Sequence, residues 1–270
     1  MLDVVIPTIK GREESLYKLI DSIVVDNQEV GANLIVVNDE GLLAYKRNKG
    51  ARQGKGDLIL FIDDDDYCEK SSLSRIIKVF KRPTVGICGM VACYHNNKGK
   101  IADGGSLRSM MTGFTLGVDT NKSLWWKGTY TVDEVANAFV VRRSLFEKLG
   151  GFDEENFPIE LDEADLCRRV KNSGFEIVMC ADAVVYHNSQ TYSYFPNFRK
   201  EQSAYYMGRN RIIYQKKHGS CYFLYHLLFL PIFVLFYTIT LSLRKKPQMV
   251  VAFLKGVRDG IRKEVTRYRR

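Results

Sequence analysis

Four consecutive aspartates, Asp63 to Asp66, directly follow the apolar run 57–62. Neighbouring carboxylates repel one another, so a cation is expected among them. Hard oxygen ligands in this number suit Mg²⁺ or Mn²⁺, with the phosphates of a substrate completing the coordination. The alternative is a solvated acidic turn that caps the next helix, but the buried strand predicted before the aspartates favours a site for metal and phosphate.

Two further groups of side chains suit the same chemistry. Asp162, Glu163 and Asp165 open a predicted helix, and either of the first two is a candidate general base. The alternative is that these acids only complement the positive end of the helix dipole. His187 follows an apolar strand and is a candidate metal ligand through its neutral imidazole, unless it is bonded locally at the strand end.

The elements that position these side chains alternate along the chain. Apolar, β-branched runs predict strands at 3–8, 33–37 and 57–62, and periodic apolar or basic segments predict helices at 13–25 and 42–53. This alternation is typical of a parallel α/β sheet. Right-handed crossovers place the carboxyl ends of the three strands at one edge, which is where open α/β sheets bind ligands.

Polar residues follow each of these strands. Pro7 and Thr8 end the first strand, Asn38 and Asp39 follow the second, and the aspartates follow the third. The chain contains no G-x-G-x-x-G after its first strand and no G-x-x-x-x-G-K-[ST], which argues against Rossmann and P-loop nucleotide sites. The sequence therefore predicts an acidic ligand site of another kind at this edge.

The remainder of the body reads less regularly. Short apolar runs alternate with polar loops over 84–145, which favours mixed strands and a mobile loop around 104–126. A short helix is expected at 144–149, and strands are expected at 176–180 and 183–186.

Six short segments occur in a compatible order and spacing. They are VVIPT at 4–8, RNKG at 47–50, GDLILFIDDD at 56–65, GGFD at 150–153, DEADLCR at 162–168 and AVVYH at 183–187. Together they resemble the inverting family 2 glycosyltransferases, over roughly residues 3–192. The resemblance implies an α/β, mostly parallel GT-A catalytic domain at residues 1–195. It also implies transfer of a hexosyl or deoxyhexosyl group, with inversion, from a nucleotide-diphosphate sugar to an acceptor hydroxyl.

The resemblance assigns roles to particular residues. The implied donor-binding residues are Pro7, Thr8, Asn38, Asp39, Arg47, Asn48, Asp63 and Asp64. The implied ligands of Mn²⁺ or Mg²⁺ are Asp65 above all, with Asp63 and His187. The implied base is Glu163, with Asp162 as its competitor, because the usual Glu-Asp order of the family is inverted here. A second departure is Asn38, where the family usually has Asp. Trp125 or Trp126 is a candidate for stacking on a sugar face, or for ordinary core packing.

Charge and cysteine usage separate the body from the tail. The 270 residues carry a net charge of +9, but residues 199–270 hold 16 Lys+Arg against 3 Asp+Glu, which leaves a slightly acidic body. We therefore expect the body not to bind nucleic acid and the tail to seek an anionic surface. The six cysteines are scattered without C-x-x-C spacing, which favours a reducing compartment and free thiols. No signal peptide is expected at the amino terminus.

Residues 196–270 are predicted to form a basic, hydrophobic helical region that attaches to a membrane. Aromatic and basic residues interleave over 198–218, as in interfacial helices, and 221–243 lacks charged residues and is long enough to span a bilayer. A single crossing would export the ten basic residues that follow, against the positive-inside tendency. Pro231 is therefore predicted to divide the segment into two halves that enter the membrane and return. An amphipathic helix is expected at 250–265.

A monotopic or re-entrant attachment at the cytoplasmic face of the cell membrane is thus the main hypothesis, with a single span and a buried or dimer-forming helix as alternatives. Because enzyme and acceptor would share a surface, the acceptor is expected to be a lipid-linked glycan. Three rival functions remain: a polyprenyl-phosphate glycosyltransferase, a sugar-nucleotide nucleotidyltransferase, and an inactive GT-A scaffold at the membrane surface. The hydrophobic run also offers a surface for a homo-oligomer.

Overall fold

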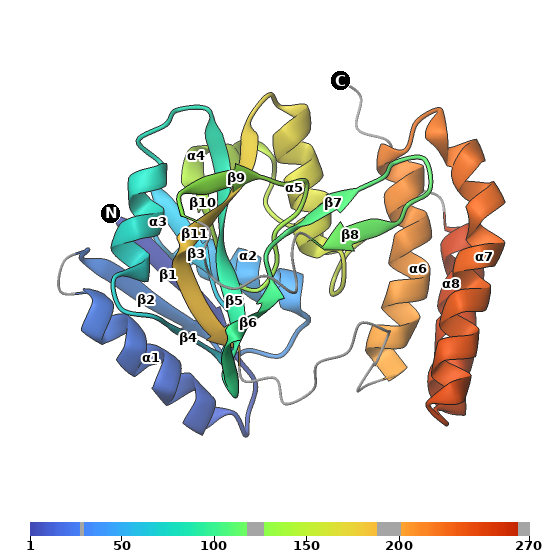
Figure 1. Ribbon diagram of the computed structural model, residues 1–270, viewed down its shortest axis with the longest axis horizontal. Coiled ribbons are helices and arrows are strands. Elements are labelled where there is room, and N and C mark those ends of the chain that lie inside the picture. Colours follow the sequence, from blue (N-terminus) through green and yellow to red (C-terminus); the bar gives the residue numbers. More distant parts are fainter. Residues whose placement is uncertain (28–29, 118–126, 188–200, 264–270) are drawn as a thin grey trace.

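A computed structural model describes residues 1–27, 30–117, 127–187 and 201–263 of the chain (Figure 1). Its strands are β1 (Leu2–Pro7), β2 (Ala32–Val37), β3 (Leu58–Phe61), β4 (Asp66–Cys68), β5 (Val85–Tyr94), β6 (Asn97–Asp103), β7 (Ser106–Arg108), β8 (Thr115–Gly117), β9 (Thr129–Thr131), β10 (Phe139–Arg142) and β11 (Glu176–His187). Its helices are α1 (Glu13–Asn27), α2 (Leu43–Gln53), α3 (Ser72–Val79), α4 (Arg143–Lys148), α5 (Asp162–Asn172), α6 (Glu201–His218), α7 (Tyr222–Leu243) and α8 (Pro247–Arg262).

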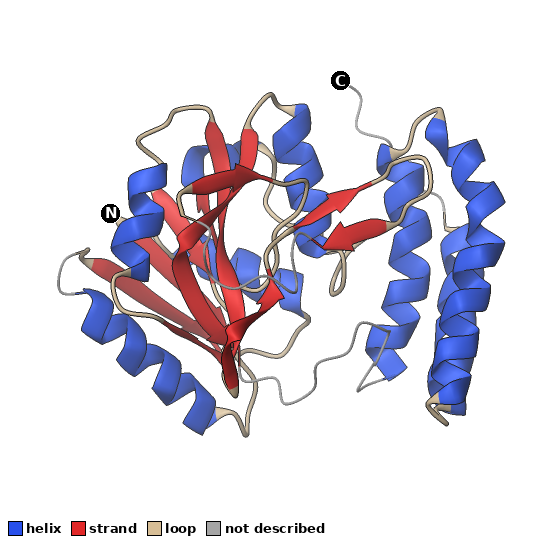
Figure 2. Cartoon of the chain, in the orientation of Figure 1, coloured by secondary structure: helices blue, strands red, loops and turns tan. Residues whose placement is uncertain are grey.

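The central sheet, whose strands are red in Figure 2, has the strand order β2-β1-β3-β10-β5-β11-β4, with β6 beside β5 and β9 beside β11. The pairs β1–β2, β1–β3 and β5–β11 are parallel, whereas β10 and β4 join antiparallel to their neighbours. The predicted alternation of strand and helix over the first 62 residues is confirmed, and the carboxyl ends of β1, β2 and β3 share one edge. The fold is the expected α/β, mostly parallel architecture.

Two apolar layers cover the two faces of this sheet. Val5 of β1 packs with side chains of α2, α4 and α5, whereas Val4 and Ile6 pack with side chains of α1 and α3. This division follows from the strand period of two, which sends successive side chains to opposite faces. The helices are thereby fixed on both sides of the edge that carries the polar strand ends.

Two parts of the middle of the chain differ from their predictions. The runs 176–180 and 183–186 form one strand, β11, because an irregularity between Cys180 and Val184 lets the strand continue along β5. Within the segment predicted as a loop at 104–126, β7 and β8 form a hairpin. Trp125 and Trp126 lie outside the described residues, as does the predicted domain boundary at 195/196.

Helices α6, α7 and α8 form a separate layer at one side of the molecule (Figure 1). The prediction that Pro231 divides residues 221–243 is wrong, because α7 is one continuous helix that contains this proline. A proline removes one backbone hydrogen bond, and the other bonds of this long helix continue on both sides of it. Among the described residues, α7 is one helix that is long and apolar enough to cross a membrane.

The basic and aromatic side chains of α6 are also placed differently from the prediction. Arg209, Arg211, Ile213, Tyr214 and Lys217 are all at most 8% exposed, so the second half of this helix is not a lipid-facing surface. These side chains are instead enclosed by the body, the β7–β8 hairpin and α7.

The amphipathic helix predicted at 250–265 is present as α8, but its apolar face is divided. Leu254 and Ile261 are exposed as expected, whereas Val257 is buried against α6. Val265 lies outside the described residues. No disulfide bond joins any of the six cysteines, as the sequence predicts, and five of them are buried.

Candidate active site

The first strand end is tied to the aspartate run through Thr8. The Thr8 backbone N–H donates to the Val37 carbonyl (3.0 Å), which joins the ends of β1 and β2. Its hydroxyl donates to Oδ2 of Asp64 (2.7 Å), and Lys46 of α2 donates to its carbonyl (2.7 Å). Arg12 completes the cage around Asp64 with a 2.5 Å ion pair. Asp64 therefore holds the β1–α1 loop in place at the edge of the sheet.

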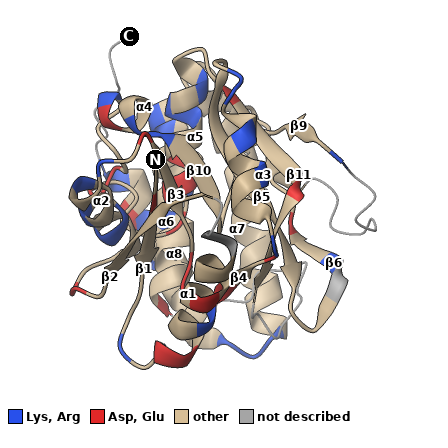
Figure 3. Ribbon diagram, turned by 90° about the vertical axis from the view of Figure 1, so that its left-hand side faces the viewer, with Lys and Arg blue, Asp and Glu red and all other residues tan. Residues whose placement is uncertain are grey.

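Helix α2 contains four basic residues, drawn blue in Figure 3, and two of them, Lys46 and Arg47, are buried. The helix can approach the sheet closely because residue 50 is glycine: a Cβ there would lie 2.4 Å from a methyl group of Val5. This close approach buries the guanidinium of Arg47, which has no exposed surface.

Arg47 connects the aspartate run to the acidic start of α5. Its Nη2 donates to Oδ1 of Asp63 (3.0 Å), and its Nη1 donates to Oδ2 of Asp162 (2.8 Å) and Oε1 of Glu163 (2.6 Å). These acids lie about a hundred residues apart in the sequence, and one guanidinium brings them together. We call Arg47, Asp63, Asp162 and Glu163 the Arg47 group.

One cation serves three carboxylates in the Arg47 group, and the acidities reflect this imbalance. Burial raises the pKa of Asp63 to about 6, although Arg47 opposes the shift. Burial and the neighbouring Glu163 raise the pKa of Asp162 well above its usual range. Burial alone would also raise the pKa of Glu163, but the charge of Arg47 and the bond from Asp162 lower it. The pair therefore favours a protonated Asp162 beside an ionised Glu163.

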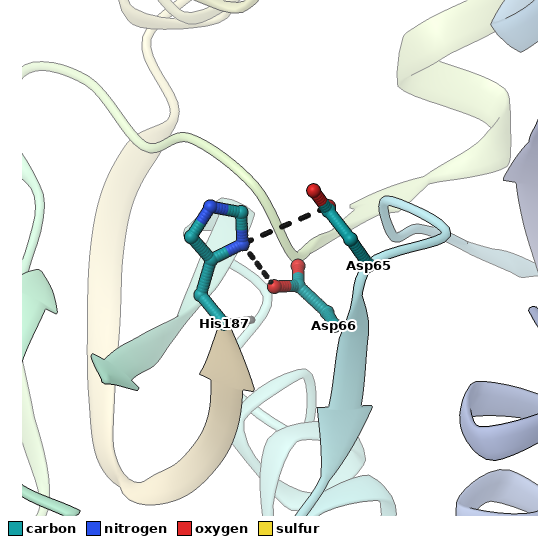
Figure 4. A group of neighbouring side chains, drawn as sticks. All are labelled: Asp65, Asp66 and His187. Carbon is teal, nitrogen blue, oxygen red and sulfur yellow. Dashed lines mark hydrogen bonds and ion pairs between the residues drawn. The ribbon is translucent and has the colours of Figure 1, made fainter. Parts of the chain in front are cut away.

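A second cluster joins Asp65, Asp66 and His187, whose ligand atoms lie within 4.8 Å of one another (Figure 4). His187 of β11 is opposite Asp66 of β4 in the antiparallel pairing, and its Nδ1 lies 2.8 Å from Oδ1 of Asp66 and 3.7 Å from Oδ1 of Asp65. Burial raises the pKa of Asp66 to about 7. Burial alone would lower the pKa of His187, but the bond to Asp66 and the nearby carboxylates raise it to about 9.

The donor set of this cluster fits a divalent cation. Two carboxylates and an imidazole are suitable ligands for Mn²⁺ and acceptable ones for Mg²⁺. The Oδ2 atom of Asp66 is buried and has no hydrogen-bond partner among the described residues, as expected for an oxygen that can bind a cation. A cleft of about 520 Å³ adjoins the cluster, and its lining residues are Ser15, Lys18, Asp21, Asp65, Asp66, Tyr67 and His95.

The other predicted site residues are placed less centrally. Asn38 and Asp39 are exposed beyond the end of β2, and Asp39 pairs with Lys49 of α2 (2.8 Å). Asn48 is buried, and its side chain bonds the backbone N–H and carbonyl of Phe152. Asn48 therefore fixes the GGFD segment, rather than pointing into the edge.

The resemblance singled out other members of the aspartate run as metal ligands but not Asp66, and the sequence did not reveal that Arg47 joins both acidic groups. The position of Asp66 in the aspartate run was the available signal. Its pairing with His187 depends on the contact between β4 and β11, which are more than a hundred residues apart. The roles of Arg12 and Lys46 were missed as well. In a sequence, a basic residue that contacts a strand end cannot be distinguished from one that is only solvated on or beside a helix.

The sheet, its acidic edge and the carboxylate pair at a helix start define a glycosyltransferase of the GT-A fold. The chain matches the model of the "Glycosyltransferase like family 2" over residues 3–208, and it belongs to that family.

One curated relative and two solved structures of the same fold illustrate the similarity. The O-antigen chain rhamnosyltransferase WbaN of Salmonella anatum is 30% identical over 183 residues, covering 64% of this chain and 53% of WbaN. The crystal structure of S. aureus TarS 1-349 is 15% identical with a TM-score of 0.54, covering 95% of this chain and 80% of TarS. The structure of GalNAc-T7 with UDP, GalNAc and Mn²⁺ is 12% identical with a TM-score of 0.56, covering 82% and 52%. The chain spans 12% to 53% of the length of the curated relatives it matches.

Proposed function

We propose that this glycosyltransferase moves a sugar, with inversion, from a nucleotide-diphosphate sugar to an acceptor hydroxyl. The observation that carries the proposal is the Arg47 group. A single buried guanidinium holds the first residue of the aspartate run, at the donor edge, together with the two candidate bases of α5. A donor at the strand ends would then lie beside a carboxylate that can take the proton of an acceptor.

Glu163 is the base in this proposal. Its carboxylate is 17% exposed and ionised, whereas Asp162 is 1% exposed and has a raised pKa. Glu163 takes the proton of the acceptor hydroxyl while the oxygen attacks the anomeric carbon. The bond from that carbon to the diphosphate oxygen breaks, and the nucleoside diphosphate leaves with the electron pair. Asp162 keeps its proton and, with Arg47, orients the base.

Asp65, Asp66 and His187 would hold a divalent cation, Mn²⁺ or Mg²⁺, and Asp63 would contact the donor from the Arg47 side. A bound cation supplies positive charge that stabilises the departing diphosphate. The GalNAc-T7 structure, which contains UDP and Mn²⁺ on the same fold, supports this assignment by analogy. Thr8 and Asp64 keep the β1–α1 loop at the edge where the nucleotide would lie.

The test is the release of nucleoside diphosphate from a panel of UDP-, GDP- and dTDP-sugars, with solubilised membrane glycolipid as the acceptor source. Glu163→Gln should lower kcat by about 10²- to 10⁴-fold, because it removes the base. Asp162→Asn, the matched neighbour, should lower kcat less, because that carboxyl is already protonated. A larger loss in Asp162→Asn than in Glu163→Gln would exchange the two roles. Failure of the wild-type chain to release any nucleotide would reject the proposed reaction.

We further propose that α7 and α8 attach the protein to the cytoplasmic face of a membrane and that the acceptor is a lipid-linked glycan. The outward side of α7 is a row of exposed apolar residues: Leu224, Leu227, Leu228, Ile232, Leu235, Phe236, Ile239 and Leu243. Because α8 packs along α7 and carries Lys255, Arg258 and Arg262, a crossing of α7 alone would bring these charges into hydrocarbon. This packing favours α7 lying along the membrane surface. The O-antigen relatives support a glycan acceptor.

The attachment is tested by flotation with vesicles that contain anionic lipid. The double variant Leu228→Glu/Leu235→Glu should reduce vesicle partitioning by at least about 100-fold, since each buried Leu contributes about 1.5 to 3 kcal/mol. The control is Val24→Glu/Val25→Glu, which changes two similarly exposed apolar residues on α1, away from this layer. Equal partitioning of the two double variants would contradict attachment through α7.

A further inference from the structure

The turn 159–161, which leads into α5, is strained. Glu160 and Leu161, the two residues before α5, both have positive φ angles (63° and 63°). Residues with a Cβ adopt this left-handed conformation only at a cost in free energy. Because Asp162 and Glu163 follow at once, the turn sets the direction in which both carboxylates leave the backbone. Something outside the turn has to hold it.

Asn210 of α6 provides that hold. Its side chain is fully buried, and its Nδ2 donates to the carbonyls of Ile159 and Glu160, both at 2.8 Å. Its Oδ1 accepts a hydrogen bond from Arg209 (2.6 Å), which also binds the carbonyl of Asn156 (2.8 Å). Both donors and the acceptor of the Asn210 amide are thus used, and two of these bonds end on the carbonyls of the strained turn.

Residues in the first turn, the middle and the last turn of α6 also contact the turn 159–161 or the first turn of α5. Ser203, in the first turn of α6, bonds the side chain of Glu160. Ile213 of α6 packs with Leu161 in one small apolar cluster. The last turn of α6 supplies Lys217 and His218, each 2.7 Å from Asp165 of α5. Contacts along α6 therefore hold both the turn 159–161 and the beginning of α5.

Helix α6 is in turn fixed by α8, the partner of the apolar α7. A Cβ at Gly256 of α8 would lie 2.0 Å from the carbonyl oxygen of Tyr205, so the two helices touch backbone to backbone there. Such contact leaves α6 little freedom to shift along α8. The C-terminal helices that carry the exposed apolar face are thereby joined to the turn before the candidate base.

We propose that Asn210 is a positioning residue for the candidate base: through the carbonyls of Ile159 and Glu160 it holds the left-handed conformation of Glu160 and Leu161, so that the carboxylates of α5 face Arg47. The role rests on the proposed transferase function for its effect on turnover. It does not rest on that function for its effect on the conformation of the turn. The C-terminal layer then serves the active site directly, besides any part it has in attachment.

The test compares two buried amides on α6. Asn210→Asp is isosteric and keeps the bond from Arg209 but loses both N–H donors to the turn. Gln215→Leu is the control, because Gln215 is equally buried and its side-chain amide has no hydrogen-bond partner among the described residues. Asn210→Asp should lower kcat at least tenfold with the donor KM within twofold of wild type, while Gln215→Leu leaves kcat within twofold. Equal losses in the two variants, or a parallel loss of donor affinity, would overturn the proposal.

Rescue separates positioning from a general loss of structure. Glycine adopts positive φ without strain, so Glu160→Gly should reduce the need for the clamp. The double variant Asn210→Asp/Glu160→Gly should therefore recover kcat to within about threefold of Glu160→Gly alone. No recovery would contradict the role given to Asn210.

Amide hydrogen exchange gives an outcome that does not depend on substrate. Asn210→Asp should speed exchange in the peptide 159–166 and leave the strands of the sheet unchanged, whereas Gln215→Leu should not change that peptide. Unchanged exchange in Asn210→Asp would overturn the inference by itself. If the wild-type chain releases no nucleotide, the proposed function fails, and the exchange result still decides the role of Asn210.

Discussion

Two groups of buried charges meet at the first turn of α5, and they have opposite compositions. The Arg47 group has one cation for three carboxylates. The second group has one central carboxylate, Asp165, which contacts Arg169, Lys217 and His218 at 2.7 to 2.8 Å. Burial alone would raise the pKa of Asp165, but its cationic and hydrogen-bonding partners lower it far below the usual range. In the Arg47 group, by contrast, two of the three carboxylates have raised pKa values.

This difference distinguishes the candidate active site from a structural contact between α5 and α6. Buried charges stabilise a fold only when they are well paired, so the Asp165 group, in which a single carboxylate has all its partners, holds α6 against the body. The Arg47 group keeps more negative charge than its cation can balance. Such an excess lowers stability, and it is useful where a proton, a cation or a cationic transition state has to be received. Charge balance thus distinguishes the two roles within one helix.

The largest expected effect is that of Arg47→Met. This change leaves three neighbouring carboxylates without their cation, so it should lower the free energy of unfolding by about 3 to 5 kcal/mol and abolish turnover. Chemical denaturation and nucleotide release measure the two effects. Arg47→Lys is the control, since it keeps the charge but loses the forked contacts, and it should be milder in stability than in activity. If Arg47→Met were as stable as wild type, this result would contradict the claim that Arg47 balances the charge of the three carboxylates.

A smaller effect is expected for Asp165→Asn. The variant removes charged hydrogen bonds to α6, and Lys217 keeps its second partner, Asp153, so a loss of about 2 to 3 kcal/mol is expected at pH 7. The pKa of Asp165 is lower in the folded chain than in the unfolded one. Its contribution is therefore complete above about pH 4, the ordinary value, and is lost as the pH falls further. The gap in Tm between wild type and variant should narrow from pH 5 towards pH 2. A difference in Tm that does not change with pH would show that the charge of Asp165 does not hold α6 against α5.

The smallest effect is expected for Glu160→Gln, in the turn that precedes α5 and both groups. Burial raises the pKa of Glu160 to about 7. The folded chain therefore binds this proton more tightly than the unfolded chain, and the contribution of Glu160 to stability is lost as the pH rises from about 4 through 7. Wild type should lose Tm relative to Glu160→Gln over that interval, which is the reverse of the trend for Asp165. The same trend in both pairs of proteins would remove the contrast drawn here.

Much of the body could be predicted from the sequence because its signals are local. The strands around Val5 and Leu60 are continuous apolar runs, and each ends in residues that a buried strand does not tolerate. The edge that gathers Thr8 and Asp63 then follows from the handedness of the crossovers. The acidic start of α5 was visible for the same reason, as a run of carboxylates before an apolar period.

The tail was predicted less well because its decisive contacts are distant in sequence. Arg211 reads as a surface residue, but it is buried with its guanidinium 3.8 Å from the centre of the Phe233 ring. Lys217 finds its partners Asp153 and Asp165 more than fifty residues away. A basic, aromatic helix has the same composition whether it faces lipid or a set of carboxylates and rings. Only the partner decides, and the partner is not in the local sequence.

The most direct test of the candidate site is calorimetric titration with UDP, GDP and dTDP, with and without Mn²⁺, on the wild-type chain and on Asp65→Ala. Asp65 is a proposed ligand in the cluster with Asp66 and His187, and it does not touch the Arg47 group through any described hydrogen bond or ion pair. We predict that wild type binds one of the three nucleotides in a Mn²⁺-dependent manner and that Asp65→Ala loses this dependence while remaining folded. Binding that is the same with and without Mn²⁺, or the same in both proteins, would contradict the donor and metal site described above.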